Sequence, residues 1–141
     1  MYDRNVLRTE LIRDEDLVLT PYQDSVGVWT VGVGHNLQAK PITHDTAMVM
    51  LEHDIRDSEE SLDRISETWR TLDGVRQRVL LNMVFNLGED GLRGFRNMWS
   101  AVDAADYEQA AHEMLDSRWA VQVGVRATRL ADMMRTGMEP A

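Results

Sequence analysis

The sequence predicts an α+β fold that is mostly α-helical, with one small β region and two lobes. Three observations support this fold class. Apolar residues recur at helical spacing before and after one short segment. That segment, at about residues 17–37, is rich in valine and glycine and alternates with a period of two. A later stretch is apolar almost all round, which is typical of a buried central helix.

The first helix is expected over about residues 2–14. Leu7, Leu11 and Glu15 recur at i, i+4 and i+8, so Glu15 continues the apolar face of this helix. Pro21 stops any helix. The triplet Gln23-Asp24-Ser25 indicates a turn, because Asp and Ser side chains bond to nearby backbone groups.

A glycine-rich strand is expected to follow this turn. Alternation would place one set of residues on the same face: Val26, Val28, Thr30, Gly32 and Gly34. Glycine is costly inside a strand unless the backbone bends or approaches another group closely. A face with so little bulk beside the Thr30 hydroxyl suits a sugar-binding cleft. A plain twisted hairpin is the structural alternative.

A long helix is expected over about residues 43–70, with Thr43 as its N-cap and an apolar stripe that ends at Trp69. The next helix would begin after Asp73 as N-cap and end at Gly88 as its C′ residue. Shorter helices follow, one with Asp106 as N-cap. These boundaries divide a single domain, residues 1–141, into a small lobe (about 15–45), a linking helix (about 43–70) and a helical lobe (71–141) that includes the N-terminal helix.

Two amides lie four residues apart in the expected central helix, Asn82 and Asn86. Buried amides are normally hydrogen-bonded. We therefore favour core amides that bond backbone over polar groups at the floor of a cleft.

Glu15, Asp24 and Thr30 are the residues that indicate chemistry. Glycosidic-bond hydrolysis needs a carboxylic acid to protonate the leaving oxygen and a second carboxylate that stays ionised. An acid serves at neutral pH when an apolar setting keeps it protonated. Asp14 could share the apolar face with Glu15, and periodicity alone does not separate them. A helix end with solvated acids is the structural alternative.

Three blocks in order carry a resemblance to a known family. The first is E-x8-D-x5-T, formed by Glu15, Asp24 and Thr30 and closed by "TVGVGH". The second is "TLDGVRQRVLLNMVFNLGEDGLRGF", residues 71–95. The third combines "SRW", residues 117–119, with "RATRLADMMRTG", residues 126–137. In these blocks the whole chain resembles the phage-type, T4-like lysozymes, the endolysin muramidase family, and the resemblance implies their lysozyme-like fold.

The resemblance implies roles for the first block. Glu15 would be the general acid, Asp24 would hold or deprotonate the attacking water, and Thr30 would hydrogen-bond that water. The product would be the inverted sugar from the β-1,4 bond between N-acetylmuramic acid and N-acetylglucosamine. No metal or cofactor is implied.

The resemblance also implies supporting positions. His35 would pair with Asp54 on the following helix as a structural ion pair, and Arg126 would lie near the catalytic glutamate. Asn36 and Phe85 would line the sugar groove. One departure is the segment from residues 38 to 41, which is shorter than in T4-type members and predicts a reduced small lobe.

Composition limits the remaining possibilities. The chain has no cysteine, which excludes a disulfide framework and fits folding in a reducing cytoplasm. No apolar run approaches the roughly 20 residues of a membrane span, and the charged start does not resemble a signal peptide. The net charge of −9 argues against nucleic acid as a partner. We expect a monomer without stable membrane association.

The expected partner is the glycan strand of peptidoglycan. By family analogy a separate holin would release the protein from the host cytoplasm to the periplasm and cell wall. Two other functions stay open. A lytic transglycosylase would use one glutamate, need no water site at Asp24 and Thr30, and yield an anhydro sugar. A non-catalytic peptidoglycan-binding protein would have no reason to keep that trio.

Overall fold

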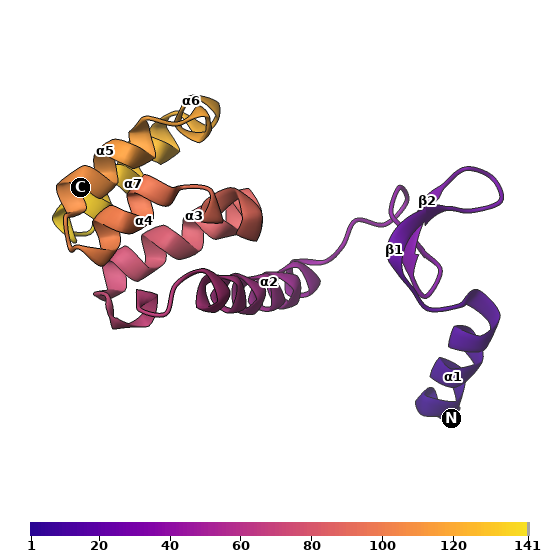
Figure 1. The fold of residues 1–141 in the computed structure, drawn as a ribbon. Coiled ribbons are helices and arrows are strands. Elements are labelled where there is room, and N and C mark those ends of the chain that lie inside the picture. Colours follow the sequence, from indigo (N-terminus) through magenta and orange to yellow (C-terminus); the bar gives the residue numbers. More distant parts are fainter. Residues whose placement is uncertain (141) are drawn as a thin grey trace. The chain divides into compact units, whose positions relative to one another are not determined.

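The computed structural model describes residues 1–140 and shows a mostly helical fold with a small antiparallel sheet, as predicted (Figure 1). Its Cα positions group into two compact units, Met1–Val49 and Met50–Ala141. The first unit holds one helix and three strands, and the second is helical. Among the described residues, no helix combines the length and apolar character needed to cross a membrane.

Helix α1 (Arg4–Glu15) opens the first unit. Asp3 caps its N-terminus by accepting from the Asn5 and Val6 N–H groups at 2.8 and 3.2 Å. At the other end the Asp16 N–H donates to the Ile12 carbonyl at 2.9 Å. The expected helix is confirmed, with both boundaries shifted slightly toward the C-terminus.

Strands β1 (Val18–Gln23), β2 (Trp29–Gly32) and β3 (His35–Asn36) form an antiparallel sheet in the order β1-β2-β3. The predicted β region is confirmed, but the expected alternation from Val26 to Gly34 is too long. Val26 lies in a turn because the Asp24 carboxylate accepts its N–H, and the strand begins only at Trp29. Gly34 lies in the β2–β3 turn with φ +60°.

Helix α2 (His44–Ile65) begins after Thr43, whose hydroxyl accepts from the Thr46 N–H at 3.2 Å and confirms the expected N-cap. The helix ends at Ile65 rather than near residue 70. Ser66 Oγ accepts from the Thr68 and Trp69 N–H groups and holds the chain in a turn. A short 3-10 helix, η1 (Trp69–Thr71), then carries the buried Trp69 ring.

The second unit packs around helix α3 (Gly74–Arg93), which contributes five buried residues: Val79, Leu80, Met83, Val84 and Leu92. The expected buried central helix and its Asp73 cap are confirmed. Gly88, with φ 78° and ψ 170°, interrupts the helix at the predicted stop, and a further turn and a half follow as a second segment.

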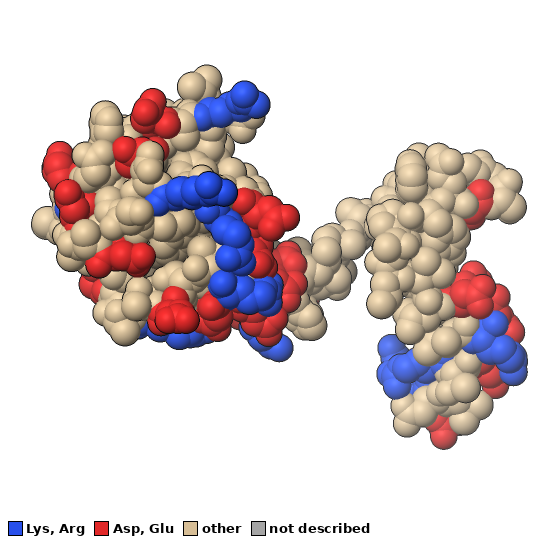
Figure 2. All heavy atoms as spheres, in the orientation of Figure 1, with Lys and Arg blue, Asp and Glu red and all other residues tan. Residues whose placement is uncertain are grey.

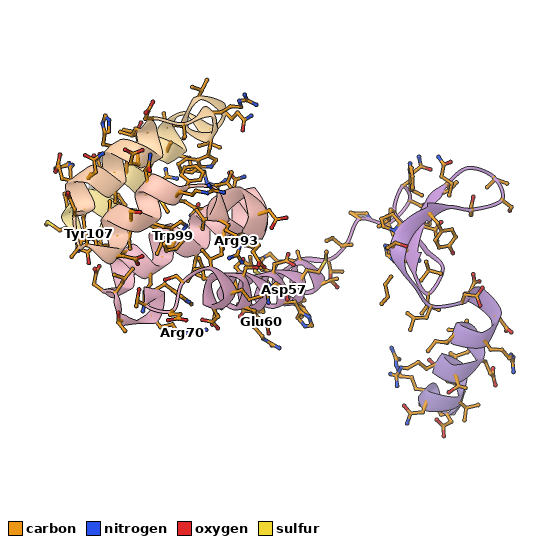
Figure 3. The ribbon with its side chains drawn as sticks, viewed as in Figure 1. Asp57, Glu60, Arg70, Arg93, Trp99 and Tyr107 are labelled. Atoms are coloured by element: carbon orange, nitrogen blue, oxygen red, sulfur yellow. The ribbon has the colours of Figure 1, made fainter. Side chains whose placement is uncertain are left out.

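Four shorter helices complete this unit: α4 (Arg96–Asp103), α5 (Tyr107–Leu115), α6 (Arg118–Val123) and α7 (Val125–Thr136). Asp106 caps α5, as predicted, by accepting from the Gln109 N–H at 3.1 Å. Helix α5 packs against α4 and α7. Trp99 of α4 is almost fully buried, and its indole N–H donates to the Leu92 carbonyl at 3.0 Å (Figure 3).

Candidate active site

Glu15 is the last residue of α1, and its exposed carboxylate lies against the β2–β3 turn. A Cβ built on Gly34 would stand 2.6 Å from Glu15 Oε2, so only a glycine hydrogen fits between the two residues. Within this unit α1 buries none of its residues. The apolar face that Leu7 and Leu11 share with Glu15 therefore does not surround the carboxyl group here.

Asp24 occupies the turn between β1 and β2, as predicted. Its Oδ1 atom accepts from the Val26 and Val28 N–H groups, each at 2.9 Å. The Asp24 N–H donates to the Val28 carbonyl at 2.9 Å. These bonds hold the half-buried side chain in one orientation through a single oxygen, so the orientation of the other oxygen is fixed as well.

Thr30 lies in the centre of the sheet and is 5% exposed. Its hydroxyl donates to the Val28 carbonyl at 2.9 Å. A hydroxyl that has given its one hydrogen to a carbonyl can only accept from a further partner. Thr30 stands opposite Tyr22 on β1 and Asn36 on β3, so these three side chains share one face of the sheet.

Asn36 and His35 of β3 both bind the loop that follows them. Asn36 Oδ1 accepts from the Gln38 and Ala39 N–H groups at 3.0 and 2.9 Å. His35 Nε2 lies 2.8 Å from the Lys40 carbonyl oxygen. Because a carbonyl only accepts, Nε2 carries the hydrogen in this bond.

The expected pair of His35 and Asp54 spans the two units. Asp54 lies on α2 in the second unit, where its carbonyl accepts from the Ser58 hydroxyl at 2.9 Å. The pairing therefore stays a prediction, and so does a role for Asn36 in sugar binding.

The second unit brings Phe85 and Arg126 together in one groove of about 520 Å³, on α2, α3 and α7. Arg126 donates from Nε and Nη2 to Asn82 Oδ1 at 2.9 and 2.7 Å. Phe85 is 47% exposed. The full lining is Leu51, Ile55, Ser58, Arg78, Leu81, Asn82, Phe85 and Arg126. An apolar groove lined by two arginine side chains, Arg78 and Arg126, suits a polar, partly anionic ligand.

Asn82 and Asn86 correct the expectation of core amides bonded to backbone. Neither side chain is fully buried, and both accept from other side chains. Asn82 orients Arg126, and Asn86 accepts from the Trp119 indole N–H at 2.8 Å. The two amides lie about one turn apart on α3, but their partners come from α7 and α6, far along the chain.

A larger hollow of about 600 Å³ lies beside η1 and the α4–α5 connection. Its polar groups serve the fold: Ser66 accepts from backbone N–H groups, and the Thr71 hydroxyl donates to the Thr68 carbonyl at 2.7 Å. The Arg76 guanidinium lies 3.6 Å from the centre of the Tyr107 ring and covers one aromatic face. Size alone therefore does not locate the active site.

Two carboxylates of the second unit have clear electrostatic partners. Hydrogen bonds from Arg70 and then Trp69 lower the pKa of Asp63 below its usual value. Hydrogen bonds from Arg64 and then Arg93 lower the pKa of Glu89. Figure 2 shows such acidic and basic side chains intermixed on the visible face, while the strands carry few charges there. These ion pairs support the fold and lie outside the groove of Phe85 and Arg126.

Comparison with known proteins identifies the class. The model of the phage lysozyme family matches residues 13–135, and the chain therefore belongs to the phage lysozyme family. This membership supports a lysozyme-like function in peptidoglycan degradation.

Individual relatives are more distant. The chain is 28% identical to the pre-baseplate central spike protein Gp5 of Enterobacteria phage T4, over 94% of this chain and 28% of that protein. It is 25% identical to probable T4-type lysozyme 1 of Dictyostelium discoideum, over 88% of this chain and 90% of the relative. The SAR-endolysin of Escherichia phage Mu is 27% identical over 86% of this chain and 70% of its own length.

Proposed function

We propose that this chain is an endolysin muramidase. It hydrolyses the β-1,4 bond between N-acetylmuramic acid and N-acetylglucosamine in bacterial peptidoglycan, with inversion at the anomeric carbon. Glu15 gives a proton to the leaving oxygen. Asp24 and Thr30 hold the attacking water, and Asp24 takes a proton from it as the new C–O bond forms.

The Thr30 hydroxyl is the observation that carries this proposal. Because its hydrogen is donated to the Val28 carbonyl, the hydroxyl oxygen can accept an O–H from water through a free lone pair. A water that donates one hydrogen to Thr30 and the other to the Asp24 carboxylate keeps a lone pair for the anomeric carbon. Asp24 is already oriented by two backbone N–H groups, so the site is preorganised for this step.

The groove of the second unit contributes binding rather than chemistry. Phe85 offers an exposed ring for a sugar face, and Arg126, which Asn82 holds in place, is proposed to bind polar groups of the glycan. Asn36 lies on the same sheet face as Thr30 and is proposed to contact the glycan there. No metal or cofactor takes part in this scheme.

The acid is tested by Glu15→Gln, which keeps the shape of the side chain and removes the proton. General acid catalysis contributes about 10²–10⁴-fold, so we expect lysis of permeabilised Gram-negative cells to fall at least a hundredfold with unchanged circular dichroism. Glu10→Gln is the matched control, since Glu10 is an exposed glutamate on the same helix. Retention of more than about a tenth of the wild-type activity by Glu15→Gln would contradict the assignment.

A lytic transglycosylase and a non-catalytic wall-binding protein are the alternatives. A transglycosylase would release anhydro-muropeptides, which mass spectrometry separates from hydrolysed products by one water. A binding protein would release neither. The ordered Asp24 and Thr30 side chains favour hydrolysis, because both alternatives leave a water site without a purpose.

The biological setting is likewise proposed. The protein would act on its host's wall during cell lysis, as a monomer, after a holin lets it pass from the host cytoplasm to the periplasm. Neither nucleic acid nor stable membrane association is part of this proposal.

A further inference from the structure

We propose that Gly34 is a positioning residue for the general acid. Because glycine has no side chain, it leaves the space that the Glu15 carboxylate occupies. This inference rests on the proposed function, in which Glu15 is the acid. Three atoms of Glu15 surround the site where a Cβ would stand: Oε2 at 2.6 Å, Cδ at 3.0 Å and Cγ at 3.2 Å.

The backbone on the Glu15 side of this contact is held in place. Asp16 follows Glu15 with φ 65° and ψ 158°, a conformation that is essentially restricted to glycine. Its N–H donates to the Ile12 carbonyl at 2.9 Å, and this bond fixes the last turn of α1. Glu15 can therefore respond to a new Cβ mainly by rotating its own side chain.

The effect of adding a side chain at position 34 depends on which atoms the new Cβ would contact. All three close atoms belong to one flexible glutamate, and none belongs to backbone. The backbone can therefore stay in place when a Cβ is added, whereas the Glu15 carboxylate must move away from residue 34. Misplacement of a reacting group by about 1 Å can cost on the order of a hundredfold in rate.

Gly32 provides a matched control in the same hairpin. It also has a positive φ, +71°, but a Cβ added there meets no heavy atom within 4 Å. Gly32→Ala therefore introduces the backbone strain of a positive φ without the contact. The difference between Gly34→Ala and Gly32→Ala isolates the contact with Glu15.

The test measures kcat and KM separately on soluble peptidoglycan strands. For Gly34→Ala we expect kcat to fall about 10–100-fold with KM within about twofold of wild type. Gly32→Ala should lower kcat by a clearly smaller factor than Gly34→Ala does, because it lacks the contact with Glu15. If Gly34→Ala does not fold, Gly34→Asn replaces it, since asparagine tolerates positive φ and also carries a Cβ. Equal kcat losses at Gly34 and Gly32, or a change confined to KM, would overturn the inference.

A second measurement separates this inference from the proposed function. In the wild type, NMR should show nuclear Overhauser contacts between the Glu15 Hγ and Gly34 Hα protons, and these should be lost in Gly34→Ala. Absence of the wild-type contact overturns the role of Gly34 even where Glu15→Gln is inactive. A contact that is present while Glu15→Gln stays active refutes the assignment of Glu15 as the acid instead.

Discussion

In the proposed function, Thr30 and Asp24 each combine a structural task with a chemical one. Each is held by the local backbone: Thr30 by the Val28 carbonyl and Asp24 by the Val26 and Val28 N–H groups. The same bonds leave the hydroxyl lone pairs and one carboxylate oxygen for a further partner. A water held by both would approach the sugar from the sheet, while Glu15 comes from the helix.

This arrangement predicts the outcome of Thr30→Glu. The new carboxylate would stand where the water was held and could act as a nucleophile. Inverting enzymes keep their carboxyls about 6.5–9.5 Å apart, against about 5–5.5 Å when the second carboxyl attacks. We expect mass spectrometry to show a saccharide bound to Thr30→Glu after exposure to peptidoglycan. The wild type should release the α-anomer first, and a β-anomer would contradict the role of the water.

Asp16 predicts a stabilising substitution. Asp16→Gly would relieve backbone strain of about 1–3 kcal/mol. Glycine also gives the unfolded chain more conformational freedom, which lowers the free energy of unfolding by about 0.5–1 kcal/mol. We therefore expect urea unfolding to show a net gain of about 1 kcal/mol. Asp16→Ala is the control, because it removes the carboxylate and keeps the strain. A gain of the same size in Asp16→Ala would attribute the effect to charge.

At the scale of elements, caps and ion pairs join the helices of the second unit. Glu89 on α3 accepts from Arg64 of α2 at 2.7 Å and from Arg93 at 2.8 Å. Arg76 links α3 to the end of α7 by donating to the Met134 and Arg135 carbonyls. These contacts join α2 to α3 and α3 to α7 in addition to the apolar packing.

The Glu89 network predicts a dependence of stability on pH. Because Arg64 and Arg93 lower the folded pKa of Glu89 below its ordinary value of 4.5, Glu89 stabilises the fold above that pH. The contribution is lost as pH falls through the lowered folded value. Glu89→Gln should therefore flatten the acid side of the melting-temperature profile. Glu60→Gln, at an exposed position on α2, serves as the control (Figure 3). Identical profiles for the two variants would count against the network.

At the scale of the whole molecule, the catalytic candidates divide between the two units. Glu15, Asp24 and Thr30 belong to the first unit, whereas Phe85 and Arg126 belong to the second. Binding and chemistry would thus come from separately packed parts of one chain. The net charge of −9 predicts little electrostatic attraction to an anionic wall.

The expected ion pair between His35 and Asp54 would connect the two units, and it can be tested by its coupling free energy. A double-mutant cycle with His35→Ala and Asp54→Asn should give a coupling free energy of about 0.5–3 kcal/mol in urea unfolding. The cycle cancels the loss of the His35 bond to the Lys40 carbonyl, which occurs in both arms. Additive effects within about 0.5 kcal/mol would refute the pair.

The sequence alone determined the fold class, the order of the elements and most helix starts. Caps at Thr43, Asp73 and Asp106 were predictable because a capping side chain bonds within three residues of itself. Helical periodicity identifies α3 as the central helix, because this pattern is also contained in a short stretch of sequence. The strand that starts at Trp29 was misjudged, since alternation does not reveal how far a turn held by Asp24 extends.

Only the tertiary structure decided which partners meet across long stretches of chain. Arg126 bonds Asn82 from 44 residues away, and Asn86 accepts from Trp119 at a separation of 33. The contact between the Glu15 side chain and Gly34 likewise depends on how α1 lies against the β2–β3 turn. Local propensity contains no information on such contacts, because their free energy arises only when distant segments pack together.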